Sequence, residues 1–100
     1  MRTASAVIVN PAHIAVALRY APPAVDVPVV VSSGADASAA VVRALAAFHD
    51  VPIIESPALA RALHARVGLD EPIPEDLYAA VAMVFAWILR SRGRIGGSPT

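Results

Sequence analysis

The sequence contains no cysteine, which excludes a disulfide framework, a thiol nucleophile and a metal site with cysteine ligands. Lysine is also absent, so all eight cationic side chains are arginines, and they balance eight acidic residues to a formal charge of zero. The chain therefore lacks the overall basic character that is typical of nucleic-acid-binding domains. A long hydrophobic run is missing as well, because the longest apolar stretch, Leu77–Leu89, is shorter than the ~20 residues that a membrane-spanning helix needs.

Most of the chain has the composition of a folded domain. Hydrophobic residues make up 57% of the sequence and charged residues 16%, which excludes intrinsic disorder for most of it. One hundred residues are enough for one domain with one hydrophobic core. We expect that domain to span residues 1–90, and we expect residues 91–100, which are rich in glycine, serine and arginine, to form a disordered tail.

The pattern of β-branched runs, turn residues and helical periodicity predicts the order of the secondary-structure elements. Strands are expected at 3–9, 14–20, 29–31 and 53–54, and helices at 37–48, 57–67 and 74–89. A loop that contains Pro22, Pro23, Asp26 and Pro28 is expected between the second and third strands. The order β-β-β-α-β-α-α predicts an α/β fold in which a small, about four-stranded sheet is surrounded by three or more helices.

The spacing of apolar residues also predicts which faces are buried. In the second strand large residues alternate with Ala15 and Ala17, so a helix is expected to pack closely against the small-residue face. The first helix is expected to begin after an N-cap residue, Asp36. The predicted buried stripes are Val41, Val42, Leu45 and Phe48 in the first helix, Leu59, Leu63 and Val67 in the second, and Leu77, Val81, Val84, Phe85 and Ile88 in the third.

The tetrapeptide Asn10-Pro11-Ala12-His13 lies between the first two strands, and its Asn-Pro bond has unusual chemistry. In an ordinary Asn-X pair the following backbone nitrogen attacks the Asn side chain, but Pro11 has no N–H and this route is closed. The remaining intramolecular reaction is attack by the Asn10 side-chain nitrogen on the Asn10 carbonyl carbon, which forms a succinimide and releases the nitrogen of Pro11. A tight turn would accelerate this self-cleavage through proximity, and His13 could orient the amide or carry a proton.

Other interpretations of the polar residues stay open at this point. Asn-Pro is also a common turn initiator, and a histidine beside a strand is often simply packed or solvated. Ser33, His13 and Asp36 are the residue types of a multiple-turnover hydrolase, but they have no recognised spacing and no Gly-x-Ser-x-Gly elbow. His49 and His64 are expected on helix surfaces, and neither a metal nor a cofactor is expected.

Several ordered blocks of the sequence together resemble the cytoplasmic C-terminal domain of the FlhB/YscU/SpaS family, with its HrcU-like members. These are the export-switch proteins of flagellar and virulence-associated type III secretion systems. The resemblance covers nearly everything from Ala6 to Leu89. The family's Asn-Pro-Thr-His signature is present as Asn10-Pro11-Ala12-His13, and the further matching blocks are Ile14–Tyr20, Gly34–Asp36, Pro52–Leu63 and Ile73–Tyr78.

The resemblance implies a cytoplasmic domain at the inner face of the bacterial inner membrane, joined to it only through an N-terminal transmembrane part that this sequence does not contain. It implies that the chain cleaves itself between Asn10 and Pro11, with at most one turnover per chain. The two pieces then stay together in one fold, and the apparatus changes the class of substrates that it exports. The candidate catalytic residues are therefore Asn10, Pro11 and His13, without cofactor or metal. Export-apparatus proteins, secreted substrates and a secreted ruler protein are the implied partners, and nucleic acid is not.

Two positions depart from the family pattern. The family threonine is Ala12, which removes a hydroxyl beside the scissile bond, and the usual lysine before Gly34 is Ser33. The alternative function is therefore a free-standing, non-cleaving relative that serves as a docking module for secretion substrates or apparatus proteins. The block His13–Tyr20 and Trp87 resemble the injectisome branch more than the flagellar branch, but the sequence does not decide between the two systems.

Overall fold

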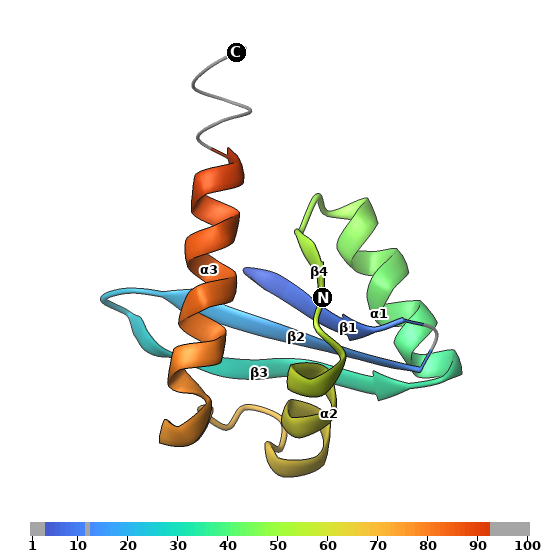
Figure 1. Cartoon of the computed structure of the whole chain (residues 1–100). Helices are drawn as coiled ribbons and strands as arrows, with labels where there is room; N and C mark the ends of the chain where they lie inside the picture. The colour runs from blue at the N-terminus through green and yellow to red at the C-terminus, as the bar shows by residue number, and fades with distance from the viewer. Residues whose placement is uncertain (1–3, 12, 93–100) are drawn as a thin grey trace.

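A four-stranded mixed sheet forms the centre of the computed structural model, which describes residues 4–11 and 13–92 (Figure 1). Its strands are β1 (Ala6–Asn10), β2 (Ile14–Ala21), β3 (Val25–Ala35) and β4 (Ile53–Glu55). They lie in the order β3-β2-β1-β4, in which β4 runs parallel to β1 and the other pairs are antiparallel. Strand β1 therefore has a hydrogen-bonded neighbour on each side.

Three α-helices cover this sheet, α1 (Ala37–Phe48) on one face and α2 (Pro57–Arg66) with α3 (Tyr78–Arg92) on the other (Figure 1). A single 3-10 turn, η1 (Glu75–Leu77), leads into α3. The predicted α/β fold and the predicted order β-β-β-α-β-α-α are confirmed. Helix α3 runs to Arg92, into the predicted tail, and residues 93–100 lie outside the described part. Among the described residues no helix has the length and hydropathy that crossing a membrane requires.

The alternation of side chains along β1 and β2 produces a separate core on each face of the sheet. The face with Ala15 and Ala17 packs against α1, so the prediction of a close-packed small-residue face is correct. The opposite face packs against α2 and α3, whose predicted stripes are buried except for Phe85, which is partly buried. The larger core includes Ile8, Val16, Leu18, Val30, Leu59, Leu63, Val81 and Ile88.

The stripe predicted for α1 is wrong except at Val42. The buried residues of α1 are Ala39, Val42 and Ala46, whereas Val41 is 58% and Phe48 82% exposed. The sheet face beneath α1 is itself built from small and β-branched residues, so the helix approaches it with its alanines. A close approach through small side chains leaves the larger residues of the helix pointing away from the sheet.

Strand β3 is longer than the predicted 29–31 at both ends: it begins at Val25, so that it includes Asp26 and Pro28 of the expected loop, and it continues to Ala35. The register between β2 and β3 shifts near Arg19, so the ladder is irregular where Pro28 lies. A segment after α2 covers the outer edge of β3, since the N–H of Ile73 donates to the carbonyl of Pro28 at 2.9 Å. Proline is tolerated at such an edge because its missing N–H is not needed for the ladder.

Candidate functional site

The Asn10–Pro11 bond lies in a tight turn between two paired strands. Strand β1 ends at Asn10, one residue later than predicted, and the Cα of Asn10 is paired with that of Ile14 at the start of β2. The backbone N–H of His13 donates a hydrogen bond of 3.0 Å to the carbonyl oxygen of Asn10. This is the i to i+3 bond of a β-turn. The carbonyl group that self-cleavage would attack is therefore fixed by the turn.

The end of β1 is also bound on its other side. The N–H of Ser56, just after β4, donates to the carbonyl of Val9 at 3.0 Å. Val9 is buried and Asn10 is half-buried, whereas Pro11 and His13 are exposed. Ala12 lies outside the described residues. Asn10 thus belongs to a fixed strand end, whereas Pro11, whose nitrogen would be the leaving group in self-cleavage, is exposed.

Asp36 faces the same turn from the start of α1. Its backbone N–H donates to the carbonyl of His13 at 2.7 Å, and its carboxylate Oδ1 lies 3.7 Å from Nδ1 of the His13 ring. Asp36 occupies the N-cap position, as predicted, but its side chain makes no capping hydrogen bond. The structure therefore brings Asn10, Pro11 and His13 together and adds Asp36, which the sequence indicated as a helix cap and as a member of a possible hydrolase set but not as a neighbour of the Asn-Pro turn.

The geometry of the turn is suited to acyl chemistry at Asn10. When a nucleophile adds to a carbonyl carbon, negative charge develops on the carbonyl oxygen, and a donor already aimed at that oxygen stabilises the charge. The N–H of His13 is such a donor. The nucleophile, the side-chain amide of Asn10, belongs to the same residue as the carbonyl, so no second molecule has to be positioned.

The residue set of a possible hydrolase is not assembled. Ser33 contacts His64 of α2, with 2.8 Å between Oγ and Nδ1, while His13 contacts Asp36. Ser33, His13 and Asp36 therefore do not form one nucleophile–base–acid relay. His64 lies at an exposed helix surface, as predicted. Its hydrogen bond to Ser33 joins α2 to β3, and local sequence patterns did not predict this contact because the two residues are far apart in the chain. His49 is also exposed, and its ring packs edge-on against Phe48.

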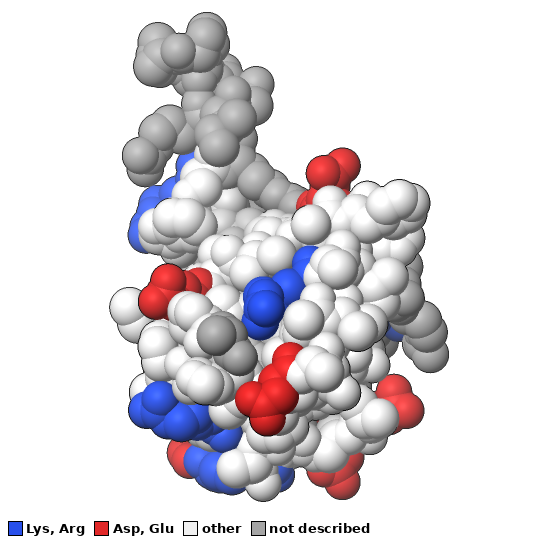
Figure 2. All heavy atoms as spheres, turned by 90° about the vertical axis from the view of Figure 1, so that its right-hand side faces the viewer, with Lys and Arg blue, Asp and Glu red and all other residues white. Residues whose placement is uncertain are grey.

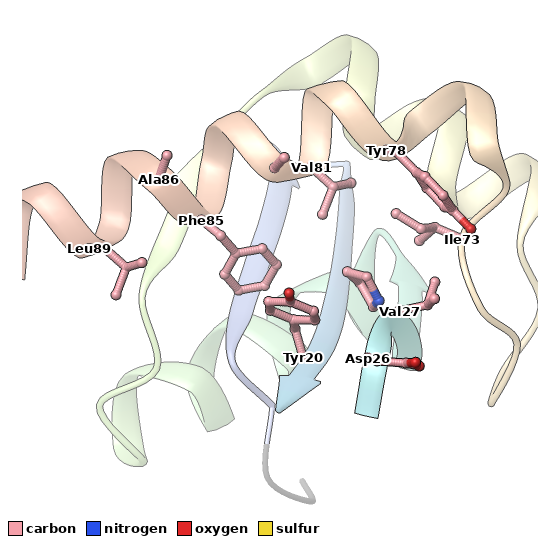
Figure 3. Close-up of a pocket in the computed structure, with 11 residues that line it drawn as sticks. Tyr20, Asp26, Val27, Ile73, Tyr78, Val81, Phe85, Ala86 and Leu89 are labelled. Atoms are coloured by element: carbon pink, nitrogen blue, oxygen red, sulfur yellow. The ribbon is translucent and has the colours of Figure 1, made fainter. Parts of the chain in front are cut away.

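An apolar groove runs between α3 and the ends of β2 and β3 (Figure 3). It has a volume of about 360 Å³. The rings of Tyr20 and Phe85 lie with their centres 5.4 Å apart and form part of its wall. Figure 3 shows Val81 and Leu89 of α3 on the same side as Phe85, with Val27 opposite. The sequence did not indicate this groove, because residues around Val27 were expected in a loop.

An ion pair between Arg66 and Asp76 holds the turn that precedes α3 against the end of α2. The guanidinium of Arg66, the last residue of α2, donates two hydrogen bonds of 2.8 Å to the carboxylate of Asp76 in η1. These hydrogen bonds, with the positive charge of Arg66, lower the pKa of Asp76 below its ordinary value. The same contact raises the pKa of Arg66. The pair joins the end of α2 to the turn that starts α3.

The surface on the side that carries α1 is mostly uncharged (Figure 2). Charged side chains of both signs are scattered over it, with no broad area of one sign among the described residues in that view (Figure 2). This distribution agrees with a formal net charge of zero.

Comparison with known proteins gives consistent matches over almost the whole chain. The sequence model of the FlhB HrpN YscU SpaS family matches residues 1–88. The chain is 45% identical over 97 residues to the hypersensitivity response secretion protein HrcU of Ralstonia nicotianae, with 97% of this chain and 26% of that protein covered. It is 44% identical over 96 residues to the flagellar biosynthetic protein FlhB of Yersinia enterocolitica, with 94% of this chain and 25% of that protein covered.

The fold is likewise similar to a solved structure, the crystal structure of the cytoplasmic domain of FlhB from Shewanella putrefaciens. The TM-score is 0.89 at 35% sequence identity, and the match covers 97% of this chain and 77% of that one. The chain spans about a quarter of the length of the curated relatives it matches.

Proposed function

Because the chain belongs to the FlhB HrpN YscU SpaS family, we propose that it is the cytoplasmic domain of a type III secretion export protein that cleaves its own backbone between Asn10 and Pro11. The family resemblance predicted from the sequence is confirmed, and membership implies association with the type III export apparatus. The observation that carries the cleavage proposal is the turn hydrogen bond from the N–H of His13 to the carbonyl of Asn10.

The proposed reaction needs only groups of the turn. The side-chain nitrogen of Asn10 attacks the carbonyl carbon of the same residue, and the developing oxyanion is stabilised by the N–H of His13. The bond to Pro11 then breaks, and the proton that the attacking amide loses is transferred to the nitrogen of Pro11. The imidazole of His13 is the group next to the turn that can carry this proton. The products are a C-terminal succinimide on residues 1–10 and a free amine on Pro11.

The fold supports the idea that the two pieces stay together after the cut. Residues 6–9 of β1 are buried, and β1 is hydrogen-bonded to β2 on one side and to β4 on the other. Residues 6–9, through which β1 pairs with β2 and β4, all precede the peptide bond that would be cut. Cleavage would therefore change the exposed turn while the cores persist.

We further propose, from family membership, that this change in the turn alters which class of substrates the apparatus exports. The partners in this proposal are export-apparatus proteins, secreted substrates and a secreted ruler protein, at the cytoplasmic face of the bacterial inner membrane. A flagellar and an injectisome relative match almost equally well, at 44% and 45% identity, so the proposal names neither system.

Mass spectrometry of the purified chain under denaturing conditions tests the cleavage. Asn10 is the only asparagine in the sequence, so cyclisation at asparagine can produce only one pair of fragments. We expect residues 1–10 and residues 11–100, the second with Pro11 at its N-terminus. A single intact mass after prolonged incubation would refute the proposal.

The apolar groove favours a second candidate function, a docking module that does not cleave. Tyr20, Phe85 and Leu89 form a partly exposed apolar surface. Covering such a surface with apolar side chains of a partner removes it from water, which is favourable. The partner in this case is a secretion substrate or an apparatus protein. The substitution Ala86→Arg would place a charge at the groove and should abolish substrate binding, while the variant, like the unaltered chain, yields no fragments. An intact mass together with substrate binding that Ala86→Arg abolishes would favour this function over cleavage.

A further inference from the structure

Asp36 has a backbone conformation that a residue with a side chain rarely adopts. It connects β3 to α1 with φ 53° and ψ −114°. Asp adopts positive φ mostly together with a positive ψ, so this combination is strained for a residue with a side chain, and strained residues of this kind concentrate at functional sites. In addition, Asp36 is an N-cap aspartate whose side chain does not cap the helix. The carboxylate is directed instead at His13.

A continuous series of contacts leads from Asp36 to the scissile carbonyl. The N–H of Asp36 bonds the carbonyl of His13 at 2.7 Å, and the N–H of His13 bonds the carbonyl of Asn10 at 3.0 Å. The carboxylate of Asp36 lies 3.7 Å from the ring of His13. Asp36 thus contacts both the backbone and the side chain of the residue that bonds the reacting group.

The fold fixes Asp36 in this place. The pairing of Ile14 with Ala35 brings the end of β3 alongside the turn. Gly34 allows the first turn of α1 to lie directly on the strand, because a Cβ at Gly34 would come within 2.7 Å of the Cβ of Ser38. The strained residue is therefore held between the end of β3 and the closely packed first turn of α1.

We infer that Asp36 is a positioning residue for cleavage at Asn10–Pro11 and that it acts through His13. Its backbone fixes His13 so that the His13 N–H stays on the Asn10 carbonyl. Its carboxylate attracts the imidazole in its protonated form and keeps the ring beside the turn, where the ring receives and delivers the proton. This inference rests on the proposed self-cleavage.

The substitutions Asp36→Asn and Asp36→Gly test the carboxylate without adding backbone strain, because Asn keeps the size and shape of the Asp side chain and Gly adopts positive φ freely. His13 and Asp36 are both exposed, and exposed ion pairs have small interaction energies. We therefore expect cleavage in both variants to be about two- to fivefold slower than in the unaltered chain. The melting temperature of Asp36→Gly should be unchanged or higher. The rate difference should shrink at high salt, which screens the charges. A role confined to folding would not produce this salt dependence.

Asp50→Gly is the matched control, since Asp50 also has positive φ, at 58°, but lies after the opposite end of α1. It should cleave at the rate of the unaltered chain. In a His13→Ala background, Asp36→Asn should cause no further loss of rate.

Equal rates for Asp36→Asn and the unaltered chain, or an undiminished loss in the His13→Ala background, would overturn the role of Asp36 while leaving self-cleavage in place. Absence of fragments from the unaltered chain would refute both.

Discussion

Ile8 is the side chain of β1 that should contribute most to retaining the short fragment after cleavage. It is fully buried in the larger core, and β1 is attached to the remainder of the sheet only by non-covalent contacts once the chain is cut. Truncation of a buried isoleucine to alanine removes both transfer energy and packing, at a cost of about 2–5 kcal/mol. Because each ~1.4 kcal/mol is tenfold in affinity, Ile8→Ala should weaken fragment binding at least about 30-fold.

The assay is gel filtration of the cleaved chain over a dilution series without denaturant, with mass spectrometry of each peak. The unaltered fragment of residues 1–10 should elute with residues 11–100, and the Ile8→Ala fragment should separate at higher concentration. Ile53→Ala on β4 is a matched control, because Ile53 is 39% exposed and the same truncation there should cost less. Equal retention of the Ile8→Ala fragment, or equal release by both variants, would refute the account of how the pieces stay together.

Three further results are expected. Gly34→Ala should lower the free energy of unfolding by about 1–3 kcal/mol, as measured by urea denaturation, because the added Cβ would meet Ser38 at 2.7 Å; an unchanged midpoint would show that α1 can move away. Asp76→Asn should destabilise the fold at neutral pH, where the Arg66 pair is formed, but not in acid. Since the pKa of Asp76 is lowered in the folded state, its contribution is present above the ordinary aspartate pKa and is lost as pH falls through the folded pKa; a destabilisation that persists in acid would contradict this. Ala12→Thr, which restores the family residue, should speed cleavage by at most about tenfold, because one hydrogen bond contributes ~0.5–1.5 kcal/mol; identical time courses would show that the hydroxyl is incidental.

Local sequence signals correctly predicted the order of the elements and the close packing of a helix against the small-residue face of β2. The alternation of alanine with larger residues in β2 was sufficient to predict a closely packed helix, and α1 packs there. The same signals failed for the stripe of α1. Hydrophobicity favoured Val41 and Phe48 for burial, but the small-residue sheet face accepts the alanines of α1. Which side of an apolar helix is buried depends on the partner surface, which periodicity alone does not contain.

The candidate site was predicted as far as its motif extends. The proposed chemistry of the Asn10–Pro11 bond and the nearby His13 depend on four adjacent residues, and the structure adds the turn in which these residues lie. The contact of Asp36 with His13 and the contact of Ser33 with His64 arise from strand pairing and helix packing over long sequence separations, so the sequence did not predict them. Proline residues between 22 and 28 favoured a loop, and the edge position that makes Pro28 tolerable within β3 was not visible in the sequence.

Comparison of the unaltered chain with Asn10→Ala tests most directly whether Asn10 is the nucleophile. Both proteins are incubated at one pH, and their denatured masses and far-UV circular dichroism are followed over time. The unaltered chain should yield residues 11–100 together with residues 1–10 that are one water lighter than the free acid early in the time course, as a succinimide requires. Asn10→Ala should keep the same dichroism and a single intact mass. Fragments from Asn10→Ala cut at the same bond, or an unaltered chain that stays intact, would contradict the account.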